Sequence, residues 1–267
     1  MSAVPDQLSR PAFGARKERG HTGAAQATAA MSTDEEYGLW RLCLWTGPIF
    51  MVVFIVFWGV AGHNIPPWNA DLPASTIAEW FRSEVNTIRG GMVIAMTTAP
   101  LYAVWGLGIG RVMGQAVGQR SLLIDLQVWG AGLTVIPVLV STSFWLTGAY
   151  RPEGLPDHLL QMLYDMAWLL IDLAYFTTSI QLFAVGAGFL KDRRAQPLVP
   201  KWLSWYAIWV GFMFIAECLM PFFKSGPFAR DGLLNFWIEF LIWFVWCPTL
   251  SFYLLRAVRR IEAEARA

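Results

Sequence analysis

Long apolar runs alternate with short polar connections along most of this chain. Six of the runs reach the length of about 20 residues that an α-helix needs to cross a hydrocarbon core about 30 Å thick. They lie near residues 40–61, 89–111, 122–147, 159–190, 202–223 and 233–255. The pattern predicts an all-α fold, a polytopic membrane helix bundle with six transmembrane helices.

The polar ends of the chain divide it into three parts. Residues 1–38 are rich in Arg, Gly, Ala, Ser and Thr, a composition that buries little surface, and we expect a disordered cytoplasmic tail there. They lack the apolar core of a signal peptide, and Met31 is a second candidate for the start of translation. Residues 39–260 form the predicted six-helix transmembrane domain, and residues 261–267 form a cytoplasmic C-terminal tail.

The connection between the first two apolar runs has a helical period of its own. Ile77, Trp80, Phe81 and Val85 recur at helical spacing, opposite charged residues. This pattern predicts an amphipathic helix over residues 73–87 that lies on the outer surface. Such a helix either caps the interior of the bundle or tethers the connection to the interface, and the sequence favours neither reading.

Composition and charge support the membrane class and give an orientation. The chain is 56% hydrophobic and 15% charged, with a mean hydropathy of +0.45, and many of its tryptophans lie near the ends of apolar runs, as in aromatic belts. With the amino terminus inside, 15 of the 20 Lys and Arg residues fall on the cytoplasmic side. The positive-inside rule therefore predicts that both termini are cytoplasmic.

The fourth apolar run carries its polar residues on one face. A carboxylate near the middle of a bilayer costs about 2.5 to 3.5 kcal/mol on insertion scales. Steps of three and four residues place side chains on a single stripe of a helix, so the aspartates of this run face protein rather than lipid. The run contains no proline and is predicted to be straight. The stripe consists of His158, Gln161, Asp165, Trp168, Asp172, Tyr175 and Ser179.

Acids from three helices are predicted to share one depth. At 1.5 Å per residue, Asp165, Glu217 and Glu239 each lie about 9 Å below the outer surface, and Asp172 lies about 20 Å below it. Carboxylates that converge repel one another unless they share protons or bind a cation. We therefore expect an acidic pocket between the fourth, fifth and sixth spans.

Other polar and aromatic residues are expected to complete this pocket. Asn235, Glu239 and Trp246 form a second stripe on the sixth span at helical spacing. Arg89, at the outer end of the second span, is the basic side chain predicted to neutralise part of the acidic charge. His158, near the outer surface, adds positive charge at low pH. An internal salt bridge between Arg89 and one acid explains the same residues without a functional site.

Three classes of function fit these residues. The first is binding or transport of a small hydrophobic or cationic ligand in an outward-facing acidic pocket. The second is a membrane enzyme of the isomerase, hydratase or cyclase type that acts on a lipid, isoprenoid or sterol-like substrate. The third is a non-catalytic subunit that binds a partner membrane subunit. Membrane lipid is a partner in each case, and no metal, cofactor or nucleic-acid partner is predicted.

Two segments carry a resemblance to a family. The segment PLVPKWLSWYAIWVGFMFI contains a Pro-x-Trp-Leu turn at Pro200, Trp202 and Leu203, followed by Trp205, and ASTIAEWFRSEVNTIRGGM lies in the outer connection. Together they resemble uncharacterised bacterial six-helix integral membrane proteins, in which such a cytoplasmic turn opens the fifth span. The resemblance implies the six-helix topology and a bacterial inner membrane, and it implies no activity or site residue.

Overall fold

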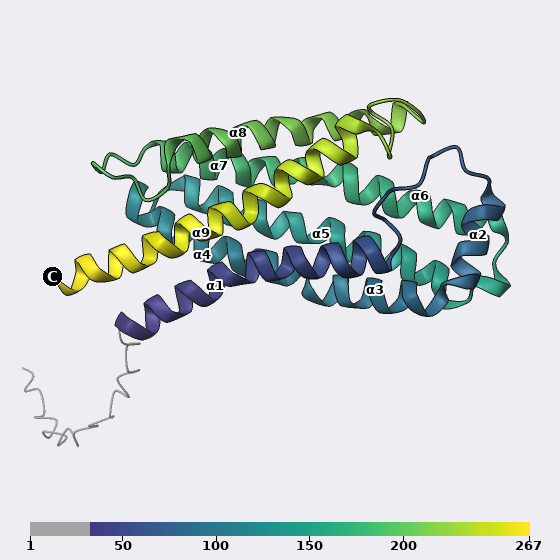
Figure 1. The fold of residues 1–267 in the computed structure, drawn as a ribbon, viewed down its shortest axis with the longest axis horizontal. Helices are drawn as coiled ribbons and strands as arrows, with labels where there is room; N and C mark the ends of the chain where they lie inside the picture. Colours follow the sequence, from purple (N-terminus) through teal and green to yellow (C-terminus); the bar gives the residue numbers. More distant parts are fainter. Residues whose placement is uncertain (1–32) are drawn as a thin grey trace, which may run out of the picture. The chain divides into compact units, whose positions relative to one another are not determined.

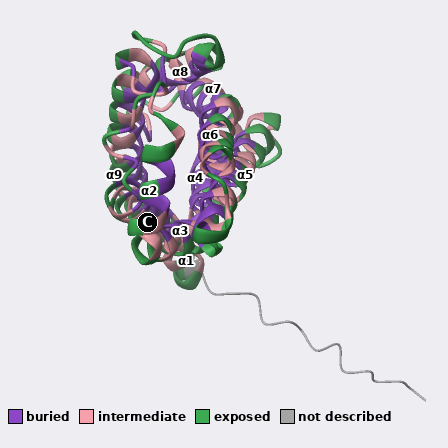
Figure 2. Ribbon diagram, turned by 90° about the vertical axis from the view of Figure 1, so that its right-hand side faces the viewer, coloured by how far each residue is buried: buried purple, intermediate pink, exposed green. Residues whose placement is uncertain are grey.

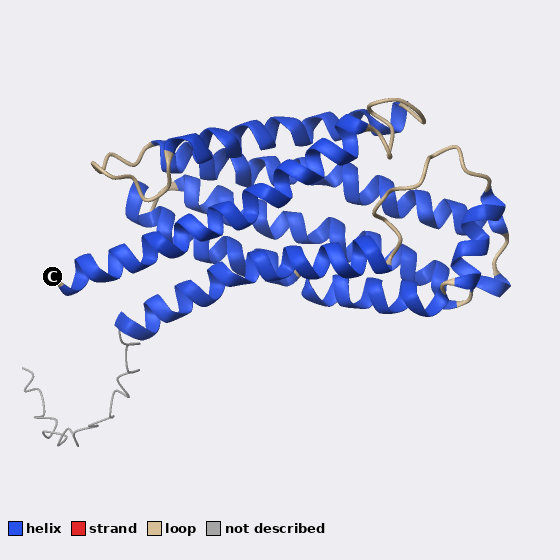
Figure 3. Ribbon diagram, viewed as in Figure 1, coloured by secondary structure: helices blue, strands red, loops and turns tan. Residues whose placement is uncertain are grey.

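The computed structural model describes residues 33–267, and within this range every regular element is a helix (Figure 3). Six helical stretches are long and apolar enough to cross a membrane, and they coincide with the six predicted runs. The prediction of an all-α bundle with six membrane spans is confirmed. The expected tail over residues 1–32, including Met31, lies outside the described residues.

Residues 33–267 form nine α-helices, and eight of them build the six spans, several continuing into short 3-10 or π-helical segments (Figure 1). The helices within residues 33–267 are α1 (Thr33–Phe54), α2 (Ala74–Ser83), α3 (Val85–Thr98), α4 (Pro100–Val117), α5 (Leu122–Tyr150), α6 (Asp157–Ala174), α7 (Thr178–Leu190), α8 (Lys201–Ala216) and α9 (Glu239–Arg266). α3 with α4 forms the second span, and α6 with α7 forms the fourth.

Both ends of the transmembrane domain extend further than predicted. α1 begins at Thr33, so residues 33–38 belong to the first helix rather than to a tail. α9 continues to Arg266, where its guanidinium donates to Asp34 at 2.8 Å and to Glu262 at 2.8 Å. The predicted tail over residues 261–267 is therefore almost entirely helical, because ion pairs with α1 and within α9 hold its last turn.

The helices enclose a closed interior at the end where α1 begins and α9 ends, which we call the terminal end. α1 packs against α4 and α9, α4 against α5, α5 against α7, α7 against α8, and α8 against α9, which completes the ring. Buried residues face inward in the view from the opposite end (Figure 2). Large apolar side chains such as Leu42 and Trp129 point outward, as expected of a surface that contacts lipid.

The opposite end of the bundle, which we call the α2 end, is covered by the predicted amphipathic helix. α2 is shorter than the predicted range of 73–87, because the backbone turns at Glu84 into α3. Its apolar face is buried against the bundle: Phe81 packs on Gly148 of α5, and Trp80 lies 5.6 Å from the ring of Tyr164 in α6. α2 is therefore a cap on the bundle.

The fourth span is not one continuous α-helix, although it contains no proline. A 3-10 turn at Tyr175–Thr177 separates α6 from α7. A second 3-10 segment, Glu217–Phe222, ends the fifth span, and a π-helical segment, Leu233–Ile238, begins the sixth. Departures from the regular helix often mark functional sites because they redirect side chains. The irregular segments of the fifth and sixth spans lie at the α2 end of those spans, and the turn in the fourth span lies near its middle.

Candidate functional site

Three buried acids from three spans come together between these irregular segments. Asp172, Glu217 and Glu239 have 5%, 3% and 1% of their surface exposed. The carboxyl groups of Glu217 and Glu239 face one another, and Asp172 lies close enough to interact electrostatically with both. Asn235, on the π-helical segment, is a direct neighbour of Asp172. We call these four residues the acidic cluster.

Asp172, rather than Asp165, occupies the level of the two glutamates. The fourth span has 34 residues and the fifth only 22, so α6 projects beyond α8 toward α2 (Figure 1). Asp172 lies 18 residues from Leu190, at the terminal end of the fourth span, and Glu217 lies 16 residues from Lys201, at the terminal end of the fifth. These separations correspond to about 27 and 24 Å along the two helices, so the two acids lie at nearly the same level. The predicted depths require spans of equal length, and these two spans are unequal.

Arg230 is the basic partner at this site, and Arg89 is not. Arg230 donates from Nη1 to Asp165 Oδ1 at 2.9 Å, and its charge also acts on Asp172. Arg89 instead donates to the carbonyl oxygens of Ala149 at 3.0 Å and Tyr150 at 2.9 Å, where it satisfies the end of α5. The predicted pairing of Arg89 with the acids is therefore corrected.

The Arg230 guanidinium is held on several sides. Its Nε and Nη2 donate to the carbonyl oxygens of Trp68 at 3.0 Å and Asn69 at 3.2 Å. The same guanidinium lies 5.0 Å from the ring centre of Tyr164 and 5.7 Å from that of Trp168. Aromatic faces attract cations, more strongly where water is excluded. This part of the structure is built to hold a buried positive charge.

A pocket of about 300 Å³ opens at the α2 end, and its wall residues Trp168 and Met220 lie four and three residues along the chain from Asp172 and Glu217. Residues of α6, of the end of the fifth span and of two connections form its walls. Gln161 on one wall donates to the carbonyl oxygen of Leu72 at 3.1 Å, which ties α6 to the connection before α2. The walls include Gln161, Asp165, Trp168, Met220, Lys224 and Arg230.

Several polar atoms of the acidic cluster have no hydrogen-bond partner among the described residues. They include Asp172 Oδ2, Glu217 Oε2, both carboxyl oxygens of Glu239 and both amide atoms of Asn235, and they are fully buried. The neighbouring Tyr175 hydroxyl is also unpartnered within residues 33–267. Buried polar groups in native proteins are nearly always hydrogen bonded, so these groups must pair with one another through protons or meet another polar partner. Ionisable groups inside membrane spans are candidates for a functional site.

The remaining predicted residues divide between this site and other places. Trp168 links the pocket to the interior, and Tyr175 packs against Trp243 with ring centres 5.4 Å apart. His158 is exposed in the first turn of α6, away from the acidic cluster. Trp246 is buried against Trp105, at a ring-centre distance of 5.4 Å, deeper in the bundle.

The sequence prediction missed Arg230 because its partners are far away along the chain. Arg230 lies in the short connection between the fifth and sixth spans, 65 residues from Asp165 and 162 residues from Trp68. The only local signal is a single basic residue close after Gly226 and Pro227, which mark a turn. Within residues 33–267, no three His, Cys, Asp or Glu side chains are arranged to hold a metal ion.

No protein-family model, curated protein or solved structure matches this chain. Its class therefore follows from its own features. Six helices that are long and apolar enough to cross a membrane indicate a multi-pass membrane protein.

Proposed function

We propose that this protein binds a small organic cation in the pocket at the α2 end, with the acidic cluster as its countercharge. In this proposal the protein lies in a bacterial inner membrane with both termini in the cytoplasm, and the pocket opens to the outside. The observation that carries the proposal is the group of buried carboxyl and amide atoms on three spans, which begins within about one helical turn of the pocket residues Trp168 and Met220.

The surroundings of Arg230 support a cation as the ligand. Arg230 is itself a cation held by a carboxylate, by two carbonyl oxygens and by the faces of Tyr164 and Trp168. The same kinds of groups bind free ammonium and guanidinium compounds. Trp168 lines the pocket, so a cation that enters lies within reach of its indole face, and Asp165 on the same wall offers a carboxylate.

The balance of charge supports the same ligand. Four carboxyl groups, of Asp165 in the pocket wall and of Asp172, Glu217 and Glu239 deeper in the bundle, stand against two cations in the wall, Arg230 and Lys224. Charged carboxylates away from water are costly unless a counter-ion or protons neutralise them. A bound cation therefore replaces protons on the acidic cluster, which couples ligand binding to pH.

Binding to the full-length protein in detergent tests the proposal. We would titrate benzyltrimethylammonium by isothermal calorimetry and compare Asp172→Asn and Glu239→Gln with the unaltered chain. Each substitution is expected to weaken binding by about tenfold or more, equivalent to about 1.4 kcal/mol. Glu79→Gln, on the exposed face of α2, is the matched control and should bind as the unaltered protein does. Equal affinity in all four proteins would contradict the role of the acidic cluster.

A second experiment removes the Arg230 side chain and tests whether a free cation can take its place. Arg230→Ala should create a site for methylguanidinium, which copies the lost head group. Arg82→Ala is the matched control, since Arg82 also pairs with an aspartate, Asp157, at 2.8 Å, and also donates to backbone carbonyls, but lies outside the pocket. Methylguanidinium should stabilise only the Arg230 variant against thermal unfolding. Stabilisation of both variants, or of neither, would count against a cation pocket.

Two further assays separate binding from the other classes of function. Proton-coupled uptake of the cation into proteoliposomes, lost on Asp172→Asn, would make the protein a transporter. Chemical turnover of an isoprenoid or sterol in detergent, without a gradient and without cation binding, would identify an enzyme and overturn the proposal.

A further inference from the structure

A second pocket lies at the terminal end of the bundle, between the connection from α7 to α8 and the last turns of α9. Its volume is about 340 Å³. Pro197 and Leu198 of the connection form one wall, and Tyr253, Arg256 and Arg260 of α9 form the other. This pocket shares no residue with the one at the α2 end.

The connection that forms one wall is held rigidly. Asp192 is buried and accepts from the backbone N–H of Arg194 at 3.1 Å and of Leu198 at 2.8 Å. The Lys201 ammonium group donates to three carbonyl oxygens near the end of α7, including that of Leu190 at 2.6 Å. The wall is therefore preorganised, so a ligand would not have to order it.

The other wall presents two guanidinium groups one turn apart. Arg260 donates to the carbonyl oxygen of Gln196 at 2.7 Å and to Glu264 at 3.0 Å, which fixes its position. Arg256 lies 5.6 Å above the ring of Phe252 and makes no hydrogen bond or ion pair with any residue of the described range. Its N–H groups are available to an anion, and guanidinium groups bind phosphate oxygens in paired hydrogen bonds.

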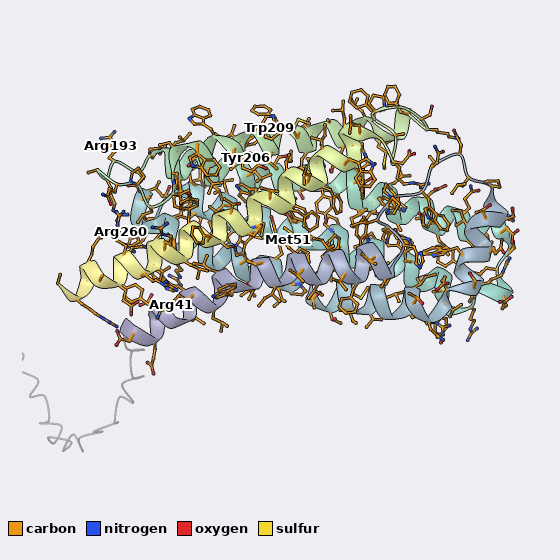
Figure 4. All side chains as sticks on the ribbon, viewed as in Figure 1. Arg41, Met51, Arg193, Tyr206, Trp209 and Arg260 are labelled. Atoms are coloured by element: carbon orange, nitrogen blue, oxygen red, sulfur yellow. The ribbon has the colours of Figure 1, made fainter. Side chains whose placement is uncertain are left out.

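The pocket lies at the level of an aromatic belt. Trp202, at the start of α8, meets the ring of Tyr253 edge-on at 6.2 Å. Trp202 and Trp205 have 55% and 62% of their surface exposed on the outside of the bundle, and Trp209 follows further along α8 (Figure 4). Exposed tryptophans at the ends of membrane helices rest at the lipid headgroups. The pocket is thus at the depth of lipid phosphates.

We infer that this pocket binds the phosphate group of an anionic phospholipid. Arg256 and Arg260 hold the phosphate, and the Tyr253 side of the pocket receives the rest of the headgroup. The acyl chains then run along the exposed apolar side chains of α8 and α9, such as Trp205 and Phe252. Basic pockets at the ends of membrane helices select anionic headgroups in this way, through charge and through hydrogen bonds to phosphate.

Native mass spectrometry of the delipidated full-length protein tests this inference. Phosphatidylglycerol and phosphatidylcholine are added in turn, because both carry phosphate but only the first has a net negative charge. We expect the unaltered protein to retain phosphatidylglycerol at least about tenfold more tightly, or about 1.4 kcal/mol. The double variant Arg256→Gln, Arg260→Gln should lose this preference. Far-ultraviolet circular dichroism checks that the variant is still folded.

The matched control is Arg259→Gln, which removes an exposed charge from the same turns of α9 but does not line the pocket. It should keep the preference for phosphatidylglycerol. An equal loss in Arg259→Gln would mean that surface charge, rather than the pocket, attracts the lipid. Displacement of phosphatidylglycerol by millimolar inorganic phosphate would assign the pocket to a soluble phosphate compound instead. Either result, or an unchanged double variant, would overturn the inference.

Discussion

Replacing Gly130 by alanine tests how closely α5 and α7 must approach. An alanine Cβ at this position would lie 2.5 Å from the backbone nitrogen of Gln181, whereas ordinary contacts begin at 3.4 Å. The obstacle is backbone, so no rotation of a side chain can relieve it. The two helices would have to separate by about 0.9 Å, the difference between these distances, in an interior packed as densely as a crystal.

The cost of this separation can be worked out from the contacts around it. Overpacking a well-filled interior costs about 1 to 3 kcal/mol. Separation also stretches the hydrogen bond between Thr134 of α5 and Thr178 of α7, now 2.8 Å. Such a bond contributes about 1 kcal/mol. We expect Gly130→Ala to destabilise the folded protein by about 2 to 4 kcal/mol.

Gly132 provides the matched control within the same helix. A Cβ there would meet nothing within 4 Å, and alanine is favoured over glycine in a helix interior by about 1 kcal/mol. Gly132→Ala should therefore leave stability unchanged or raise it. Unfolding by SDS in mixed micelles, followed by tryptophan fluorescence, measures both variants. Equal midpoints for the two would refute the close approach of α5 and α7.

Two further predictions concern charged side chains that hold backbone carbonyls. Arg89→Gln should lower the free energy of unfolding by about 1 to 2 kcal/mol, because the last carbonyls of α5 lose a charged donor, while cation binding at the α2 end stays unchanged. Weaker cation binding in this variant would show that Arg89 contributes to the site after all. Lys201→Met should lower the free energy of unfolding by about 2 kcal/mol, because three carbonyl oxygens lose the ammonium group that donates to them. The exposed Lys191→Met is its control in the same SDS titration, and equal losses would exclude the capping role.

The number of spans and their apolar character follow from the sequence alone. A membrane helix must satisfy its backbone internally and present apolar side chains to lipid, and both requirements act over about 20 consecutive residues. The helix over part of residues 73–87 and the single polar face of the fourth span also come from local periodicity. Such local patterns are readable because neighbouring residues on a helix are fixed by its geometry.

The composition of the site was readable only in part. The two glutamates and Asp172 were among the candidates, because ionisable groups inside membrane spans are costly and therefore rarely incidental. Which aspartate lies beside the glutamates depends on how far α6 extends beyond α8. That distance depends on the length of one span relative to another, which the sequence of neither span reveals by itself. Trp246 shares a stripe with Glu239, yet it packs deeper in the bundle, because the stripe continues past the acidic cluster.

Only the tertiary structure determined the charge partner of these acids. Arg230 meets Asp165, Trp68 and Asn69 across separations of 65, 162 and 161 residues. The path of the connections over the α2 end brings them together, and no periodicity within a helix encodes that path. The sequence thus determined which side chains avoid lipid, while the packing of six unequal spans decided which of them meet.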